Sequence, residues 1–137
     1  MAGNRTLTII KPDAFGAGKA GKILAHLEAQ GFVLKAARVM HLTKEEAGKF
    51  YEVHKDRGFF GELVDFMTSG PCMPMVLEKG DAVAALRAAI GSTDPAEAAE
   101  GTVRKLFAES KGRNAIHASD SDENAAVEAA FYFPGLA

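Results

Sequence analysis

The spacing of apolar and polar residues along the chain predicts a mixture of strands and helices. Positions 6–10 alternate weakly and contain β-branched residues, so they predict a strand that stops at Pro12. Positions 32–42 and 73–78 predict two further strands, and the aromatic run 131–133 predicts a last strand at a sheet edge. Because strands and helices mix without strict βα alternation, the pattern favours the α+β class.

Helices are predicted where apolar residues recur every three or four positions between capping residues. Thr43 and Glu46 form a capping-box pattern that opens one helix towards position 51. Asp81 is expected to cap another helix, which Gly91 closes. The remaining helices are predicted at 18–30, 59–67 and 102–107, and from Asp120 or Ser121 onward.

Composition and charge describe one ordinary globular domain, residues 1–137. Hydrophobic residues make up 47% of the chain and charged residues 25%, which excludes a disordered protein. The net charge of -2 argues against a nucleic-acid coat or a membrane-surface binder, so any anionic ligand has to be bound by a few placed cations. A lone Cys72, with no secretory signal or membrane span in the sequence, predicts a cytoplasmic location.

A glycine- and lysine-rich run after the first predicted strand imitates a phosphate-binding loop. Residues 16–22 have the glycine and lysine spacing of a P-loop. In a P-loop the next position carries a Ser or Thr hydroxyl that holds magnesium, whereas this chain has Ile23 there, on the apolar face of the predicted helix. We therefore reject the P-loop interpretation.

The strongest candidate for chemistry is His117, which lies among small and polar neighbours and is followed by Glu128. An imidazole beside a carboxylate can be held in one tautomer, which leaves the other ring nitrogen free as a nucleophile. Ser119 is close enough in sequence to join a hydrogen-bond chain with that carboxylate. The alternative is a surface histidine in a turn, and this stretch alone leaves both interpretations open.

Several cations elsewhere suit phosphate chemistry. Lys11 stands at a strand end, Arg87 on a predicted helix and Arg104 near a helix start. Phosphoryl transfer depends on positioning and on charge stabilisation, so separate fixed cations are what such a site needs. Each cation taken singly is compatible with a solvated surface charge, and the spacing does not show that they converge.

These residues belong to a series of motifs that resembles the nucleoside diphosphate kinase family. Asn114-x-x-His117-Ala118-Ser119-Asp120-Ser121-x-x-x-Ala125 is similar to the active-site signature of that family. The resemblance covers nearly the whole chain, from 6–13 to 131–133. Between these ends the motifs follow in the family's order: Tyr51-Glu52-x-His54, Phe59-Phe60, Met67-x-Ser69-Gly70-Pro71, Gly91-x-Thr93-Asp94-Pro95 and Gly101-Thr102-Val103-Arg104.

The resemblance implies a ferredoxin-like antiparallel sheet (βαββαβ) that helices cover on one face. It implies that a nucleoside triphosphate, mainly ATP, gives its γ-phosphate to His117, and that a nucleoside diphosphate then collects it. Mg²⁺ is implied to bridge the phosphates without a dedicated protein ligand cage. The resemblance also implies a homo-oligomer of four or six chains, although the chain ends soon after Pro134 and leaves the subunit arrangement open. No membrane and no specific nucleic acid is expected as a partner.

The resemblance also implies roles for individual residues. Phe59 matches the residue that stacks on the base, and stacking holds any base by its π-face, so base specificity is expected to be broad. Tyr51 matches a tyrosine beside the histidine. Glu128 matches the carboxylate that hydrogen-bonds the imidazole, and Ser119 the serine linked to that carboxylate. The phosphate-binding residues of the family fall on Lys11, Arg87, Thr93 and Arg104, with Arg57 nearby, and Asn114 matches the residue that reaches the sugar together with Lys11.

The chain departs from the family's motif at one position, and three other kinds of function are considered for it. Ala118 stands where the family more often has glycine; if that position needs a positive φ, alanine costs roughly 1 kcal/mol and slows turnover modestly. A catalytically silent nucleotide sensor or scaffold would lack a catalytic residue, and none is missing. An interaction module for proteins or single-stranded nucleic acid would need a basic groove rich in aromatics. A metal site at His54 and His117 is set aside, because their neighbours have no ligand spacing.

Overall fold

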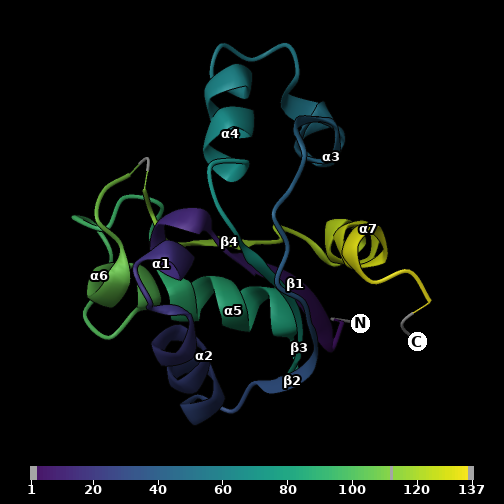
Figure 1. Cartoon of the computed structure of the whole chain (residues 1–137). Helices are drawn as coiled ribbons and strands as arrows, with labels where there is room; N and C mark the ends of the chain where they lie inside the picture. Colours follow the sequence, from purple (N-terminus) through teal and green to yellow (C-terminus); the bar gives the residue numbers. More distant parts are fainter. Residues whose placement is uncertain (1–2, 112, 136–137) are drawn as a thin grey trace.

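Four antiparallel strands, in the order β2–β3–β1–β4, form the centre of the computed structural model, which describes residues 3–111 and 113–135 (Figure 1). The central strand β1 pairs with β3 along its whole length and with β4 at its second half. This arrangement confirms the predicted α+β class and the ferredoxin-like antiparallel sheet. The strands are β1 (Arg5–Ile10), β2 (Val33–Ala37), β3 (Met73–Glu78) and β4 (Ile116–Ala118).

Helices connect the strands in the βαββαβ order, with additional helical segments between β2 and β3. No helix of the described residues is both long and apolar enough to cross a membrane. The helices are α1 (Pro12–Gly16), α2 (Ala20–Ala29), α3 (Lys44–Phe50), the 3-10 helix η1 (Glu52–His54), α4 (Phe60–Met67), α5 (Ala82–Ile90), α6 (Val103–Phe107) and α7 (Asp122–Tyr132).

Apolar side chains cover both faces of the sheet. Successive residues of a strand point to opposite faces, so Ile10 packs in one core with α2 and α5, whereas Leu7 and Ile9 pack in a second core with α3, α4 and α7. Figure 1 shows α2 and α5 on one side of the strands and α7 on the other. The expectation that helices cover only one face is therefore wrong. The second layer forms because β1 is buried on both faces, and Leu7 and Ile9 on one of them pack with Tyr132 of α7.

Capping chemistry marks helix starts as the sequence predicted. The Thr43 side chain accepts a hydrogen bond from the Glu46 N–H at 3.1 Å, and the Glu46 carboxylate accepts one from the Thr43 N–H at 2.9 Å. Ser121, not Asp120, caps α7, because its Oγ accepts from a backbone N–H in the first turn. Asp81 precedes α5 as predicted, but it makes no side-chain capping bond and its backbone is left-handed, with φ 53°.

The predicted strand at 32–42 is longer than the strand in the structure. β2 ends at Ala37, and Met40 contributes only an isolated bridge to Cys72. The side chains of β2 are at most half-buried, so the apolar content of this segment did not mark a fully paired strand. The chain leaves the sheet there and continues into α3.

The predicted C-terminal edge strand at 131–133 is wrong. Phe131 and Tyr132 form the last turn of α7, and Phe133 is its C-terminal cap. Aromatic residues favour strands only where a pleated surface receives them, and here the second core receives Tyr132 from a helix instead. The sequence analysis also missed β4, which is too short to show a periodicity, and the short helix α1.

Candidate active site

The end of β1 and the start of β4 bring Lys11 and Asn114 together at one edge of the sheet. Ile9 pairs directly with His117, and the Lys11 N–H donates to the Ala115 carbonyl at 2.9 Å, which extends the ladder by one step. The Lys11 ammonium group donates to Asn114 Oδ1 at 3.0 Å. Because the strands are antiparallel, residues separated by about a hundred positions in sequence become neighbours.

His117 is held by a carboxylate through one ring nitrogen. Nε2 lies 2.7 Å from Glu128 Oε1, and the two side chains are 21% and 20% exposed. Ser119 Oγ donates to the same carboxylate oxygen at 2.9 Å. An ionised carboxylate can only accept, so Nε2 carries the proton and Nδ1 keeps its lone pair. Nδ1 has no hydrogen-bond partner among the described residues. The side chain thus combines a fixed tautomer with a free nitrogen.

Two aromatic rings of α3 and its C-terminus hold the imidazole edge-on. The centroid of Tyr51 lies 6.3 Å from that of His117, and the centroid of Phe50 lies 5.7 Å away. The Tyr51 hydroxyl is buried without a hydrogen-bond partner among the described residues, and burial raises the pKa of Tyr51 far above its ordinary value. The sequence analysis placed Tyr51 beside the histidine but missed Phe50, because an apolar residue at the end of an amphipathic helix carries no chemical signal.

Arg104 is a buried cation on α6. Its guanidinium donates to the carbonyl of Gly91 at 3.0 Å and to that of Ile116 at 2.7 Å. Nε is buried without a hydrogen-bond partner in the described part of the chain. Burial, and secondarily the charge of Arg87, lowers the pKa of Arg104 to about 10, so the group remains charged at neutral pH. Two like charges held near each other attract an anion.

Lys11 belongs to the same region of positive charge. Burial, and secondarily the charge of Arg104, lowers the pKa of Lys11 to about 8, while the carboxylate of Asp13 acts in the opposite direction. The fold therefore brings Arg104 within electrostatic reach of both Lys11 and Arg87, which the spacing in the sequence did not show. A phosphate group would relieve the repulsion among these three cations.

A cavity of about 690 Å³ has Lys11 and an apolar wall among its lining, whereas Arg87 and Arg104 do not line it. Phe59, 45% exposed, precedes α4, and the lining residues of α4 recur at helical spacing on one face of that helix. Such a cavity suits a ligand with an aromatic ring at one end and negative charge at the other. Its lining residues are Lys11, Phe59, Glu62, Leu63, Phe66, Thr93, Lys111 and Arg113.

Some candidate residues make few or no side-chain contacts with Lys11, Asn114 and the other residues described above. Thr93 contacts it through its carbonyl, which accepts from Asn114 Nδ2 at 3.3 Å. The exposed Arg57 precedes Phe59, and its side chain makes no hydrogen bond or ion pair with any described residue. Ala118 does not adopt a positive φ, because it pairs in β4, so the expected cost at that position is not present. A positive φ occurs instead at Ala115, with a value of 76°.

The other candidate sites of the sequence analysis have structural explanations. Lys19, in the glycine- and lysine-rich run, donates to the Phe107 carbonyl at 3.0 Å, and Ile23 is fully buried in the core. The described residues contain no group of three or more His, Cys, Asp or Glu side chains arranged to hold a metal ion.

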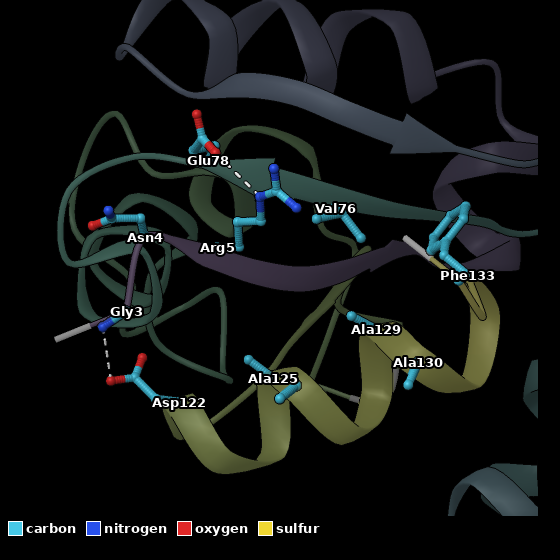
Figure 2. Close-up of a pocket in the computed structure, with 12 residues that line it drawn as sticks. Gly3, Asn4, Arg5, Val76, Glu78, Asp122, Ala125, Ala129, Ala130 and Phe133 are labelled. Carbon is cyan, nitrogen blue, oxygen red and sulfur yellow. Dashed lines mark hydrogen bonds and ion pairs between the residues drawn. The ribbon is translucent and has the colours of Figure 1, made fainter. Parts of the chain in front are cut away.

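A second hollow, of about 570 Å³, lies between α7 and the strands β1 and β3 (Figure 2). Figure 2 shows Ala125 and Ala129 of α7 on one side of it and Arg5 and Val76 on the other. A hydrogen bond from the Gly3 N–H to Asp122 links the start of the chain to α7 beside this hollow, and Arg5 donates to Glu78 on the neighbouring strand. This hollow contains none of the candidate site residues.

Comparisons with known proteins agree with the geometry. A family model described as nucleoside diphosphate kinase matches residues 4–136. The chain is 63% identical over 129 residues to a nucleoside diphosphate kinase of Chlorobium chlorochromatii (strain CaD3), which covers 94% of this chain and 92% of that protein. It is 61% identical over 129 residues to that of Chlorobium luteolum, with the same coverage. The crystal structure of the Aquifex aeolicus nucleoside diphosphate kinase superposes with a TM-score of 0.94 at 50% identity and covers 96% of each chain.

Proposed function

Because this chain belongs to the nucleoside diphosphate kinase family, we propose that its phosphotransferase activity proceeds through a phosphohistidine at His117. One observation carries the proposal: Nε2 of His117 is hydrogen-bonded to Glu128 Oε1 at 2.7 Å, whereas Nδ1 has no hydrogen-bond partner among the described residues. A nucleophile needs an available lone pair and a fixed orientation, and this ring has both. Ser119 holds the carboxylate, and Tyr51 limits the tilt of the ring.

In the first half-reaction Nδ1 of His117 attacks the γ-phosphorus of a nucleoside triphosphate, mainly ATP. The N–P bond forms while the bond from phosphorus to the bridging β-γ oxygen breaks, and the nucleoside diphosphate leaves with that electron pair. The proton on Nε2 stays in place, and Glu128 stabilises the positive charge that develops on the ring. A second nucleoside diphosphate then takes the phosphoryl group by the reverse displacement.

The cations of the site bind and stabilise the phosphates in this proposal. Lys11, Arg87 and Arg104 offset the charge that spreads over the transferred group. Thr93 and Arg57 are assigned to the phosphates as well, although only the Thr93 carbonyl contacts the cluster. Asn114 reaches the sugar hydroxyls together with Lys11, to which it is hydrogen-bonded.

Phe59 stacks on the nucleobase in this proposal. The ring is 45% exposed and lines the same cavity as Lys11. Stacking requires only a π-face, so the site is expected to accept different bases with similar affinity.

Mg²⁺ enters with the nucleotide. The residues that line the cavity include one carboxylate, Glu62, which is too few for a protein-built magnesium cage. The ion would therefore be held mainly by the phosphate oxygens, and its role is to neutralise their charge while the chain's own cations orient them.

The quaternary and cellular context is also part of the proposal. Residues 1–137 act as one domain, and the chain assembles into a tetramer or hexamer in the cytoplasm. The edge position of β2 supports assembly, since Val33 on this strand and Val39 after it are 53% and 60% exposed. The single cysteine, Cys72, is a free thiol, which is consistent with a protein of a reducing compartment.

The test of the phosphohistidine is the substitution His117→Ala. The variant is incubated with γ-labelled ATP and Mg²⁺, and the protein is assayed for acid-labile phosphate and for exchange between ATP and GDP. We expect neither label nor exchange, while nucleotide binding measured by calorimetry persists. The matched control is His41→Asn, at an exposed histidine hydrogen-bonded to the Thr68 carbonyl, which should label like the original protein. Exchange or labelling in His117→Ala would refute the assignment.

A further inference from the structure

A strained turn begins the strand that carries His117. The N–H of Ile116 donates to the Asn114 carbonyl at 2.9 Å, which closes a three-residue γ-turn around Ala115. The central residue has φ 76°, a conformation that L residues with a Cβ rarely adopt. Ala115 is fully buried, so solvent does not support its backbone groups. Such a turn persists only where its surroundings hold it.

Asp13 of α1 holds this turn from one side. Its Oδ2 accepts a hydrogen bond from the Ala115 N–H at 3.0 Å, across 102 positions of sequence. The Ala115 carbonyl accepts from the Lys11 N–H at 2.9 Å. Both backbone groups of the strained residue are therefore bonded to the end of β1 and the first turn of α1, through Lys11 and Asp13. Asn114 and Ile116 flank Ala115 in this turn, and Ile116 directly precedes His117.

The same carboxylate also acts on Lys11. Asp13 is 7% exposed, and its second oxygen, Oδ1, is buried without a hydrogen-bond partner in the described part of the chain. The charged groups that act on the Lys11 ammonium are Arg104 of α6, which lowers its pKa, and Asp13, which raises it. The negative charge of Asp13 thus supports the protonated form of a lysine that burial disfavours.

We propose that Asp13 is a positioning residue of the phosphotransfer site, which fixes the strained turn at Ala115 ahead of His117. This inference rests on the proposed roles of His117 and Lys11. It goes beyond them because Asp13 acts through the Ala115 backbone and not through a hydrogen bond to the imidazole. Its two effects are separable, since the hydrogen bond needs only an acceptor, whereas the effect on Lys11 needs the negative charge.

Two substitutions separate these effects. Asp13→Ala removes both the acceptor and the charge, so kcat/KM at pH 7 should fall on the order of tenfold or more. Asp13→Asn keeps a side-chain oxygen for the Ala115 N–H, so its loss at pH 7 should be smaller. Both variants remove the charge, so the pKa of Lys11 drops below about 8 and the alkaline fall of kcat/KM should begin at lower pH. If Asp13 had a purely structural role, the alkaline fall of kcat/KM would begin at the same pH in Asp13→Asn as in the original protein.

A second substitution tests the turn itself. Glycine adopts a positive φ without a Cβ clash, so Ala115→Gly should hold the turn without the Asp13 hydrogen bond. We expect Asp13→Ala/Ala115→Gly to recover a large part of the kcat/KM lost in Asp13→Ala and to raise its Tm. Asp81→Gly is the control, since Asp81 is the other non-glycine residue of positive φ in the described chain and is remote from the site. Adding it to Asp13→Ala should recover no activity.

The outcomes distinguish this inference from the proposed function. If Asp13→Ala keeps the original kcat/KM, or if Ala115→Gly recovers neither activity nor Tm, Asp13 does not position the site, and the role of His117 stands. If His117→Ala still exchanges phosphate, the phosphohistidine proposal fails. In that case the Tm of Asp13→Ala, measured with and without Ala115→Gly, still shows whether Asp13 holds the turn.

Discussion

Replacing Lys11 by methionine should stabilise the folded chain while it removes most of the phosphotransfer activity. Methionine keeps an unbranched side chain of similar reach but carries no charge. The folded chain holds the Lys11 ammonium in a poorly solvated position beside Arg104, where its charge is unfavourable unless an anion is bound. In the proposed complex a nucleotide phosphate supplies that anion, so the unfavourable energy of the Lys11 charge in the free enzyme is offset on binding.

The size of the effect follows from the pKa of Lys11. Its value of about 8, against an ordinary 10.5, corresponds to a penalty of roughly 3 kcal/mol on the charged form. Lys11 is only partly buried, so solvent relieves a share of this penalty. Loss of the hydrogen bond to Asn114 costs about 1 kcal/mol. The expected net gain in the free energy of unfolding is about 1 kcal/mol, or a few degrees in Tm.

Urea unfolding at several pH values measures this gain. The pKa of Lys11 is lowered in the folded chain, so between pH 8 and 10.5 the unfolded chain binds a proton that the folded chain has released. The stability of the original protein should therefore rise through this window relative to Lys11→Met, and the advantage of the variant should shrink by pH 10. At pH 7 the exchange kcat/KM of Lys11→Met should be on the order of a hundredfold lower.

The control is Lys44→Met, at an exposed lysine paired with Asp65 outside the site. It should change neither the exchange activity nor the slope of stability with pH. If Lys11→Met is less stable than the original protein at pH 7, or if the difference does not narrow as the pH rises, then desolvation does not govern Lys11. In that case the electrostatic description of the site is wrong.

Two further substitutions test the groups around the histidine. Glu128→Gln keeps the shape but removes the charge that stabilises the ring, so single-turnover phosphorylation of His117 should slow by about tenfold or more while nucleotide Kd changes little; a fall in binding alone would contradict this. Arg104→Ala removes a cation and the donor to the Ile116 carbonyl, so steady-state kcat/KM should fall about tenfold or more, and Arg104→Lys, which keeps the charge, should lose less. Equal losses in both Arg104 variants would mean that its hydrogen bonds, and not its charge, carry the effect.

Local chemistry made most of the secondary structure predictable. The Thr43 and Glu46 capping box and the apolar spacing of α5 were readable because each depends on contacts within a few residues. β3 was readable because its six residues form a recognisable apolar run, although its partner strands are distant in sequence. The failures are elements whose stability comes from distant partners. β4 has three residues and exists because β1 pairs with it. The segment 131–133 ends a helix because the second core receives its aromatic rings.

The candidate site shows the same division. His117, Glu128 and Ser119 were identifiable as a group from their residue types, and in the structure hydrogen bonds to the Glu128 carboxylate join them. Asp13 was not, because its partner Ala115 lies 102 positions away and an alanine carries no chemical signal. The strain at Ala115, rather than at Ala118, depends on a turn that only the paired strands create.

By itself the sequence determined which chemical groups are present and which helices begin where, because caps and periodic apolar faces act over one or two turns of chain. It also carried the motif series that identifies the family. Only the tertiary structure decided that Lys11, Arg87 and Arg104 share one region of positive charge, and that Asp13 supports a strained turn beside them. The physical reason is that electrostatic and hydrogen-bond energies depend on distance in space, which antiparallel pairing of β1 and β4 sets and residue spacing does not.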